Sequence, residues 1–260
     1  KRNPAPPFTT STLQQEAARK LGYSAQHTMR LAQSLYEAGA ITYMRTDGVQ
    51  MDMSAIMAAR DAIDARFSPE YRPEKPRFYS TKAKNAQEAH EAIRPTDFAV
   101  KTVSDVQLNR LYQLIYRRTL ASQMANAKIE KTVIEIGNAK LPQNFEAQGE
   151  VIIFDGFLKA YGIVKTEDDD EENNEKLLPK VTVGEVLAYK KITATEKFTR
   201  PSARYTEAGL VRKLEELGIG RPSTYAPTIQ TIQNREYVDK REIEPQIREV
   251  VKISLVKDKI

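Results

Sequence analysis

The sequence predicts a multidomain α+β protein, because the spacing of its apolar residues changes twice along the chain. Residues 1–127 carry apolar side chains at helical spacing. Residues 128–199 are rich in Val, Ile, Phe and Tyr that partly alternate, and residues 200–260 return to helical spacing. We therefore expect three units: a helical domain, a β-rich segment that forms an arch or hinge, and a second helical segment.

Four helices are expected in the first unit. Threonine or serine precedes the first two of them and glycine follows each, which is the order of residues that begins and ends helices. Prolines within residues 71–77 predict a loop between the third helix and the fourth. The expected helices run from Thr10 to Leu21, from Ser24 to Ala38, from Met53 to Phe67 and from Val106 to Ala125.

Four strands are expected in the second unit. The pair Asp155-Gly156 lies between two phenylalanines, and an Asp-Gly pair between apolar residues is a strong signal for a hairpin turn. The expected strands span residues 129–136, 146–154, 157–164 and 181–192.

The third unit is expected to resemble a winged helix. Thr206 begins one helix, which ends at Gly218 and Gly220, and a second helix spans residues 225–234. Tyr237-Val238 and a return near residues 242–244 complete a helix, turn, helix and hairpin.

The composition is that of a protein that binds nucleic acid. The chain has 260 residues, 40 Lys and Arg against 35 Asp and Glu, 12 Tyr and a net charge of +5. Its acidic residues include the run Glu167–Glu172, which we interpret as a solvated loop, so the remainder is more basic still. A metal site in that run is the weaker alternative, because neighbouring like charges repel and seldom converge on one ion.

Several classes of protein are disfavoured by what the sequence lacks. Without cysteine there is neither a disulfide framework nor a thiolate zinc site, and the two histidines, His27 and His90, are too far apart in sequence for a His-rich metal site. We expect no metal ligands in this chain. No long apolar run or basic-then-apolar leader is present, so we expect no membrane contact and a cytoplasmic location.

The first candidate for chemistry is the segment Ile41–Gly48. In extended backbone Tyr43, Arg45 and Asp47 point to one side, which brings a phenol beside a guanidinium. A phenol that attacks phosphorus needs a cation to favour its oxyanion, and arginine also binds phosphate oxygens in a bidentate manner. The alternative is a buried aromatic residue beside a surface ion pair between Arg45 and Asp47.

Two further groups of residues are candidates for phosphate binding. The glycines and Pro222 of residues 218–225 let backbone amides at a helix start approach an anion, with Arg221 adding charge; an ordinary helix cap is the alternative. In the second group, His90 and Arg94 would share one face of a helix, with Glu88 or Glu91 keeping the imidazole protonated. A structural histidine is the alternative there.

Taken in order along the chain, these groups resemble the bacterial type IA DNA topoisomerase family. The resemblance suggests the central part of such an enzyme, without its Toprim domain. It covers nearly the whole chain, although Gly48 stands where many relatives carry serine or another small polar residue, and residues 165–178 are unusually acidic. The matching segments are Pro7–Gln14, Leu35–Gly39 running into Ile41–Asp47, Glu88–Pro95, Phe154–Gly156 and Pro201–Tyr237.

The resemblance implies a reaction and roles for nine residues. Tyr43 would attack one DNA strand and become joined to its 5′-phosphate, and the strand would later be resealed after another strand has passed, which relaxes negatively supercoiled DNA. Arg45 would position Tyr43 and the phosphate, and His90 would assist them. The implied DNA-binding residues are Arg94, Arg221, Thr224, Arg235, Gln33 and Glu37, of which the last two lie on the helix before the tyrosine.

The resemblance also implies what lies outside this chain. Mg²⁺ would be bound by the Toprim domain, and the partners would be single-stranded DNA and the remaining domains of the parent protein, in the bacterial nucleoid. The helical tyrosine domain would have a winged-helix, CAP-like fold and would lift away from the other domains during strand passage. Two alternatives remain open: a DNA-binding protein without enzymatic activity, and a narrower type IA class such as reverse gyrase or a decatenating relative.

Overall fold

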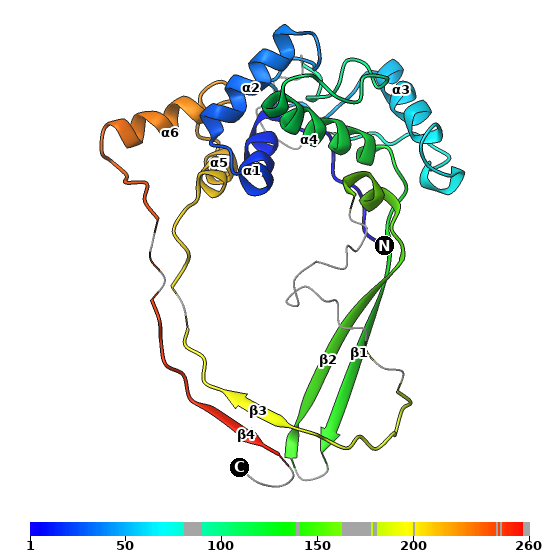
Figure 1. Cartoon of the computed structure of the whole chain (residues 1–260), viewed down its shortest axis with the longest axis vertical. Helices are drawn as coiled ribbons and strands as arrows, with labels where there is room; N and C mark the ends of the chain where they lie inside the picture. Colours follow the sequence, from blue (N-terminus) through cyan, green and yellow to red (C-terminus); the bar gives the residue numbers. More distant parts are fainter. Residues whose placement is uncertain are drawn as a thin grey trace.

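The chain traces a closed loop in the computed structural model, which describes residues 1–80, 90–138, 141–162, 178, 181–199, 201–242, 244 and 246–256 (Figure 1). A helical body occupies the top of the view, and a long two-stranded ribbon descends from it. A short two-stranded ladder lies at the bottom, and two extended segments rise from it to a pair of helices that pack against the body.

The helical body consists of α1 (Thr10–Leu21), α2 (Ala25–Glu37), α3 (Met53–Asp64) and α4 (Val106–Ser122). Local signals begin and end them: Ser24 accepts a hydrogen bond from the amide of His27 at the start of α2, and Gly22 adopts a left-handed conformation after α1. The four predicted helices are confirmed, although α3 and α4 end three residues earlier than expected. None of the described helices is long and apolar enough to cross a membrane.

One apolar core holds this body together. Leu13 of α1, Leu35 of α2, Ile63 of α3 and Ile115 of α4 are all nearly inaccessible to solvent and belong to the same cluster. Burial of such side chains is the main favourable contribution to folding, so the body gives a firm base to the segments between the helices.

The ribbon pairs β1 (Lys128–Asn138) with β2 (Leu141–Phe154) in antiparallel register, with Glu135 opposite Glu146. Two of the expected strands are therefore confirmed, but the strands connect at residues 138–141, so the hairpin turn expected at Asp155-Gly156 is wrong.

Residues 156–161 form a 3₁₀ helix, η2 (Gly156–Tyr161), where a strand was expected over 157–164. Phe157 and Leu158 are buried in the core of the body, and this tertiary burial outweighs their preference for a strand. The amide of Phe157 donates to the carbonyl of Ala125, and a Cβ on Gly156 would lie 2.5 Å from the carbonyl oxygen of Asn126, so the close approach requires glycine. Residues 163–164 lie outside the described part of the chain, as does the acidic run 167–172.

The ladder at the bottom pairs β3 (Ile192–Thr195) with β4 (Lys252–Leu255). The strand expected over 181–192 is wrong for most of its length, because Val183 and Val186 are fully exposed among the described residues and so lack the packing that favours a strand. Between the two strands the chain forms α5 (Glu207–Glu216) and α6 (Tyr225–Asn234), as predicted. Among the described residues between α6 and β4 there is no strand, and Tyr237 and Val238 are exposed. The expected wing is therefore wrong.

Helices α5 and α6 pack against α1 and α2 and so close the loop; we call this contact the closing interface. The hydroxyl of Ser11 donates to a carboxylate oxygen of Glu215 at 2.6 Å, and the amide of Ala25 donates to Glu207 at 3.0 Å. An apolar cluster completes the interface; its buried members are Ala25, Val211, Tyr225, Ala226 and Ile229.

Candidate active site

Tyr43 lies on the segment after α2, which is anchored on one side by Thr10 at the start of α1. The hydroxyl of Thr10 donates to the carbonyl oxygen of Met44 at 2.7 Å and accepts from the amide of Thr46 at 2.9 Å. The amide of Thr10 also donates to the carbonyl of Thr46. Because these groups are buried, breaking them would leave polar atoms unpaired, and the backbone on either side of Arg45 is therefore fixed.

The other side of the segment is anchored by residues 92–95. The amide of Thr42 donates to the carbonyl of Arg94, whose own amide donates to the hydroxyl of Thr42 at 3.0 Å. That hydroxyl donates in turn to the carbonyl of Ala92 at 2.7 Å. Tyr43 therefore sits between two anchor points that come from distant parts of the chain.

The ring of Tyr43 is half-buried between two other rings. Its centroid lies 5.4 Å from that of Tyr36 in an edge-to-face arrangement and 5.2 Å from that of His90. Met44 and Thr46 are each only 2% exposed, whereas Arg45 is exposed. The alternation predicted for Tyr43, Arg45 and Asp47 therefore appears in the burial of this segment, although its backbone is not a regular strand.

Residues 90–94 are not helical, so the prediction that His90 and Arg94 share a helical face is wrong. Ile93 instead donates its amide to the carbonyl of Phe8, and these bonds to other segments hold the backbone extended. The guanidinium of Arg94 donates to Glu91 at 2.7 Å and to the carbonyl of Pro95 at 3.0 Å. Glu91 thus pairs with Arg94 rather than with the imidazole, and Glu88 lies outside the described residues.

Gly48 allows the tyrosine segment to pass close to His90. A Cβ at Gly48 would lie 2.2 Å from the carbonyl oxygen of His90, well inside a van der Waals contact. Only a residue without a side chain fits this approach with the backbone as it stands, so Gly48 helps to set the position of His90 beside Tyr43.

Arg221 and Thr224 lie in the turn that precedes α6, and both are exposed. The hydroxyl of Thr224 accepts from the amide of Arg221 at 2.8 Å, while the guanidinium donates to the carbonyl of Gly220. Tyr225 follows them and is buried, which raises the pKa of its phenol; Glu215 and Asp47 raise this pKa too, and Arg221 lowers it. Asp47 and Arg221 therefore both lie near Tyr225, so the tyrosine segment and the turn before α6 meet there.

The other candidate residues are spread along two helices. Gln33 and Glu37 lie one turn apart on α2, and the amide of Gln33 donates to the carboxylate of Glu37 at 2.7 Å. Arg235 is exposed at the far end of α6, about 15 Å along the axis from Tyr225. The structure therefore brings Tyr43, Arg45 and His90 to one region and leaves Arg235 away from it.

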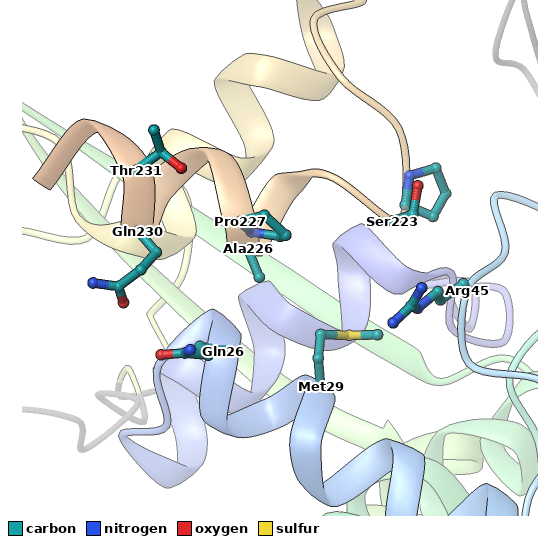
Figure 2. Close-up of a pocket in the computed structure, with 9 residues that line it drawn as sticks. Gln26, Met29, Arg45, Ser223, Ala226, Pro227, Gln230 and Thr231 are labelled. Carbon is teal, nitrogen blue, oxygen red and sulfur yellow. The ribbon is translucent and has the colours of Figure 1, made fainter. Parts of the chain in front are cut away.

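A groove of about 360 Å³ runs between α2 and α6 and ends at Arg45 (Figure 2). The sequence analysis did not find it, because its walls come from helices about 200 residues apart. Its lining residues are Gln26, Met29, Arg45, Pro222, Ser223, Ala226, Pro227, Gln230 and Thr231.

No metal site is apparent in the described part of the chain, where no three side chains of His, Asp or Glu converge. Magnesium is usually bound by one or two carboxylates together with waters and substrate phosphates, so the described residues offer no cluster of carboxylates that would hold it by themselves.

The model of the DNA topoisomerase family matches residues 1–252. The chain belongs to the DNA topoisomerase family. This topoisomerase chain is 55% identical over 240 residues to DNA topoisomerase 1 of Zymomonas mobilis, in a match that covers 91% of the chain and 20% of that protein. It is 47% identical over 251 residues to DNA topoisomerase 1 of Streptomyces coelicolor, covering 93% of the chain and 26% of that protein.

The fold agrees with this assignment. The structure of full-length topoisomerase I from Thermotoga maritima is similar to this chain, with a TM-score of 0.70 and 34% sequence identity over 92% of the chain and 39% of that protein. The predicted membership of the bacterial type IA class and the predicted α+β fold are both confirmed. The topoisomerase chain spans only about a fifth to two fifths of the length of these relatives.

Proposed function

We propose that this chain is the strand-cleaving and gate-forming part of a bacterial type IA DNA topoisomerase. The observation that carries the proposal is the placement of Tyr43, half-exposed between His90 and Tyr36 on a segment anchored at both sides. A nucleophile needs this combination, because its oxygen must reach the substrate while its backbone stays fixed.

The proposed reaction is a transfer of one phosphate ester. The phenolic oxygen of Tyr43 bonds to phosphorus, the bond from phosphorus to the 3′-oxygen breaks, and the 3′-hydroxyl leaves with a proton. The phenolic proton departs in the same exchange, so one diester replaces another. The reverse attack by the 3′-hydroxyl reseals the strand without ATP, which agrees with the lack of a Gly-x-x-x-x-Gly-Lys phosphate loop in the sequence.

We assign the surrounding residues by their positions. Arg45 is exposed and directly follows the buried Met44, so its side chain extends from a fixed backbone and can reach a phosphate beside Tyr43. His90 contacts the ring of Tyr43 and is placed to exchange a proton near it. Arg221 and Thr224 would hold the single-stranded backbone that leads to this site, with Gln33 and Glu37 on α2 and Arg94 and Arg235 as outer contacts.

We assign a separate function to each part of this chain and one to the rest of the parent protein. Residues 1–127 would carry the nucleophile, residues 128–199 would form a compliant arm, and residues 200–260 would bind DNA and return to the arm. Mg²⁺, which stabilises charge in phosphoryl transfer, would be held by Toprim carboxylates outside this chain, in a protein of the bacterial cytoplasm and nucleoid.

The test is transfer of label from a 3′-labelled single-stranded oligonucleotide to protein, with magnesium and the full-length parent. We expect label on the wild-type protein and none on Tyr43→Phe, which lacks only the attacking oxygen. Tyr36→Phe serves as the matched control, because it keeps the ring that packs on Tyr43. If wild type and Tyr43→Phe both bind DNA and neither takes up label, the chain belongs to a DNA-binding protein that does not cleave.

A further inference from the structure

The groove between α2 and α6 has three chemically different zones (Figure 2). Arg45 and Ser223 lie at one end, and the amide side chains of Gln26 and Gln230 lie at the other. Met29 of α2 and Ala226 with Pro227 of α6 lie between these ends, on opposite walls. The groove is therefore cationic at one end, apolar in the middle and lined by amides at the far end.

We propose that this groove binds one nucleobase of the cleaved strand, from a nucleotide next to the phosphate at Arg45. A nucleotide carries the same three zones, since its phosphate is anionic, the faces of its base are apolar and the edge of its base bears hydrogen-bond donors and acceptors. Arginine binds phosphate oxygens through two parallel hydrogen bonds, and glutamine amides bind base edges, adenine above all, in the same bidentate manner. The inference rests on the proposed function for the identity of the strand.

The volume agrees with such a ligand. At about 360 Å³ the groove lies at the lower end of the range for sites that bind small molecules, so it has room for one base with its sugar and not for a duplex. Met29 and Pro227 offer adaptable or flat apolar surface to the face of a base, in the place that aromatic side chains take in many proteins that bind single strands.

The groove also continues the proposed DNA track along α2. Gln26 and Gln33 are seven residues apart, and Glu37 is four residues further on, so the three side chains follow one stripe of the helix. This stripe runs from the groove toward the segment that carries Tyr43. A strand held at Tyr43 that follows the stripe therefore passes Gln33 before it reaches Gln26.

The walls of the groove belong to opposite sides of the closing interface. Gln26 and Met29 come from α2, whereas Ala226, Pro227 and Gln230 come from α6. A base in the groove contacts both sides, so it binds only while α6 is docked on α2. Binding of this nucleotide therefore stabilises the closed form, and the base must leave before the interface opens.

The experiment uses the full chain and single-stranded oligonucleotides that carry one 2-aminopurine, moved position by position along the strand. We expect the fluorescence of 2-aminopurine to change sharply at one position only. The protein concentration needed for this change should be about tenfold higher for the double variant Gln26→Ala, Gln230→Ala than for wild type. Both side chains lie on helix surfaces, so the variant should fold. Gln233→Ala is the matched control, because it removes the same side chain from α6 outside the groove.

The outcomes separate the groove from the cleavage reaction. Equal titrations of wild type and the double variant at every position would overturn the groove proposal, whatever the result of the label transfer to Tyr43. A position-specific signal that the double variant loses, without label on wild-type Tyr43, would support the groove proposal and overturn the cleavage proposal. Free dAMP tests the source of the nucleotide: competition at micromolar concentration would overturn the assignment to a nucleotide within a strand.

Discussion

Replacement of Val211 by alanine should loosen the closing interface without unfolding the helical body. Val211 is 0% exposed and lies in the apolar cluster of that interface. The substitution removes two methyl groups, which costs about 1.6 kcal/mol in transfer free energy, and the cavity that remains raises the cost to about 2 kcal/mol. Because α5 and α6 connect to the rest of the chain by extended segments, this loss falls on docking.

Amide hydrogen exchange measures this effect for each helix separately. Isolated helices of ten residues are marginal in water, so α5 and α6 should exchange once they undock. A cost of about 2 kcal/mol corresponds to exchange about 30-fold faster in α5 and α6, with the rates in α4 unchanged.

The control is Val133→Ala on β1, where the side chain is 47% exposed and the same two methyl groups are lost. We expect this control to leave all helices at wild-type rates. If Val211→Ala accelerates α4 as much as α5, the two parts unfold together and the closing interface is not an independent gate.

The remaining predictions concern the position of His90 and the stability of the body at high pH. Gly48→Ala places a Cβ against the carbonyl of His90 and should cost about 1–3 kcal/mol, lowering label transfer to Tyr43, whereas Gly137→Ala, whose Cβ would have no neighbour nearer than 3.6 Å, should change neither stability nor transfer. Burial raises the pKa of Tyr112 to about 12, above the value near 10 of an unfolded chain, so the folded state alone keeps this proton between those values and the free energy of unfolding should fall as pH rises from about 10 to 12. Denaturant titrations of wild type and Tyr112→Phe should show a shallower fall for the variant, and equal slopes would refute this reading.

The helices were predictable from sequence because the residues that begin and end them act locally. Ser24 and Thr206 accept hydrogen bonds from amides three residues ahead, so no distant contact is needed to place the start of α2 or α5. The alternation of Tyr43, Arg45 and Asp47 is also a local pattern, and it appears in the burial of this segment, whereas the roles of these residues stay predictions.

The errors occurred where distant segments decide the structure. Phe157 and Leu158 look like strand residues, yet they fill the core of a body whose other buried members lie from about 30 to about 150 residues earlier in the chain. His90 and Arg94 have helical spacing, but the backbone between them bonds to Phe8 and Gln50. The groove could not be predicted for the same reason, because α6 meets α2 only after the chain has passed through the β1–β2 ribbon and β3.

Helices α5 and α6 are an insertion within the β3–β4 ladder. The amide of Glu196 donates to the carbonyl of Val251, so the chain leaves the ladder and returns to it at neighbouring points. The residues between them can therefore change in length or sequence while the ladder keeps its register, provided that the contacts of α5 and α6 with α1 and α2 are kept. Helices α5 and α6 are in this sense an exchangeable module, and the DNA contacts that we propose for them can be engineered without a change to the ladder that carries them.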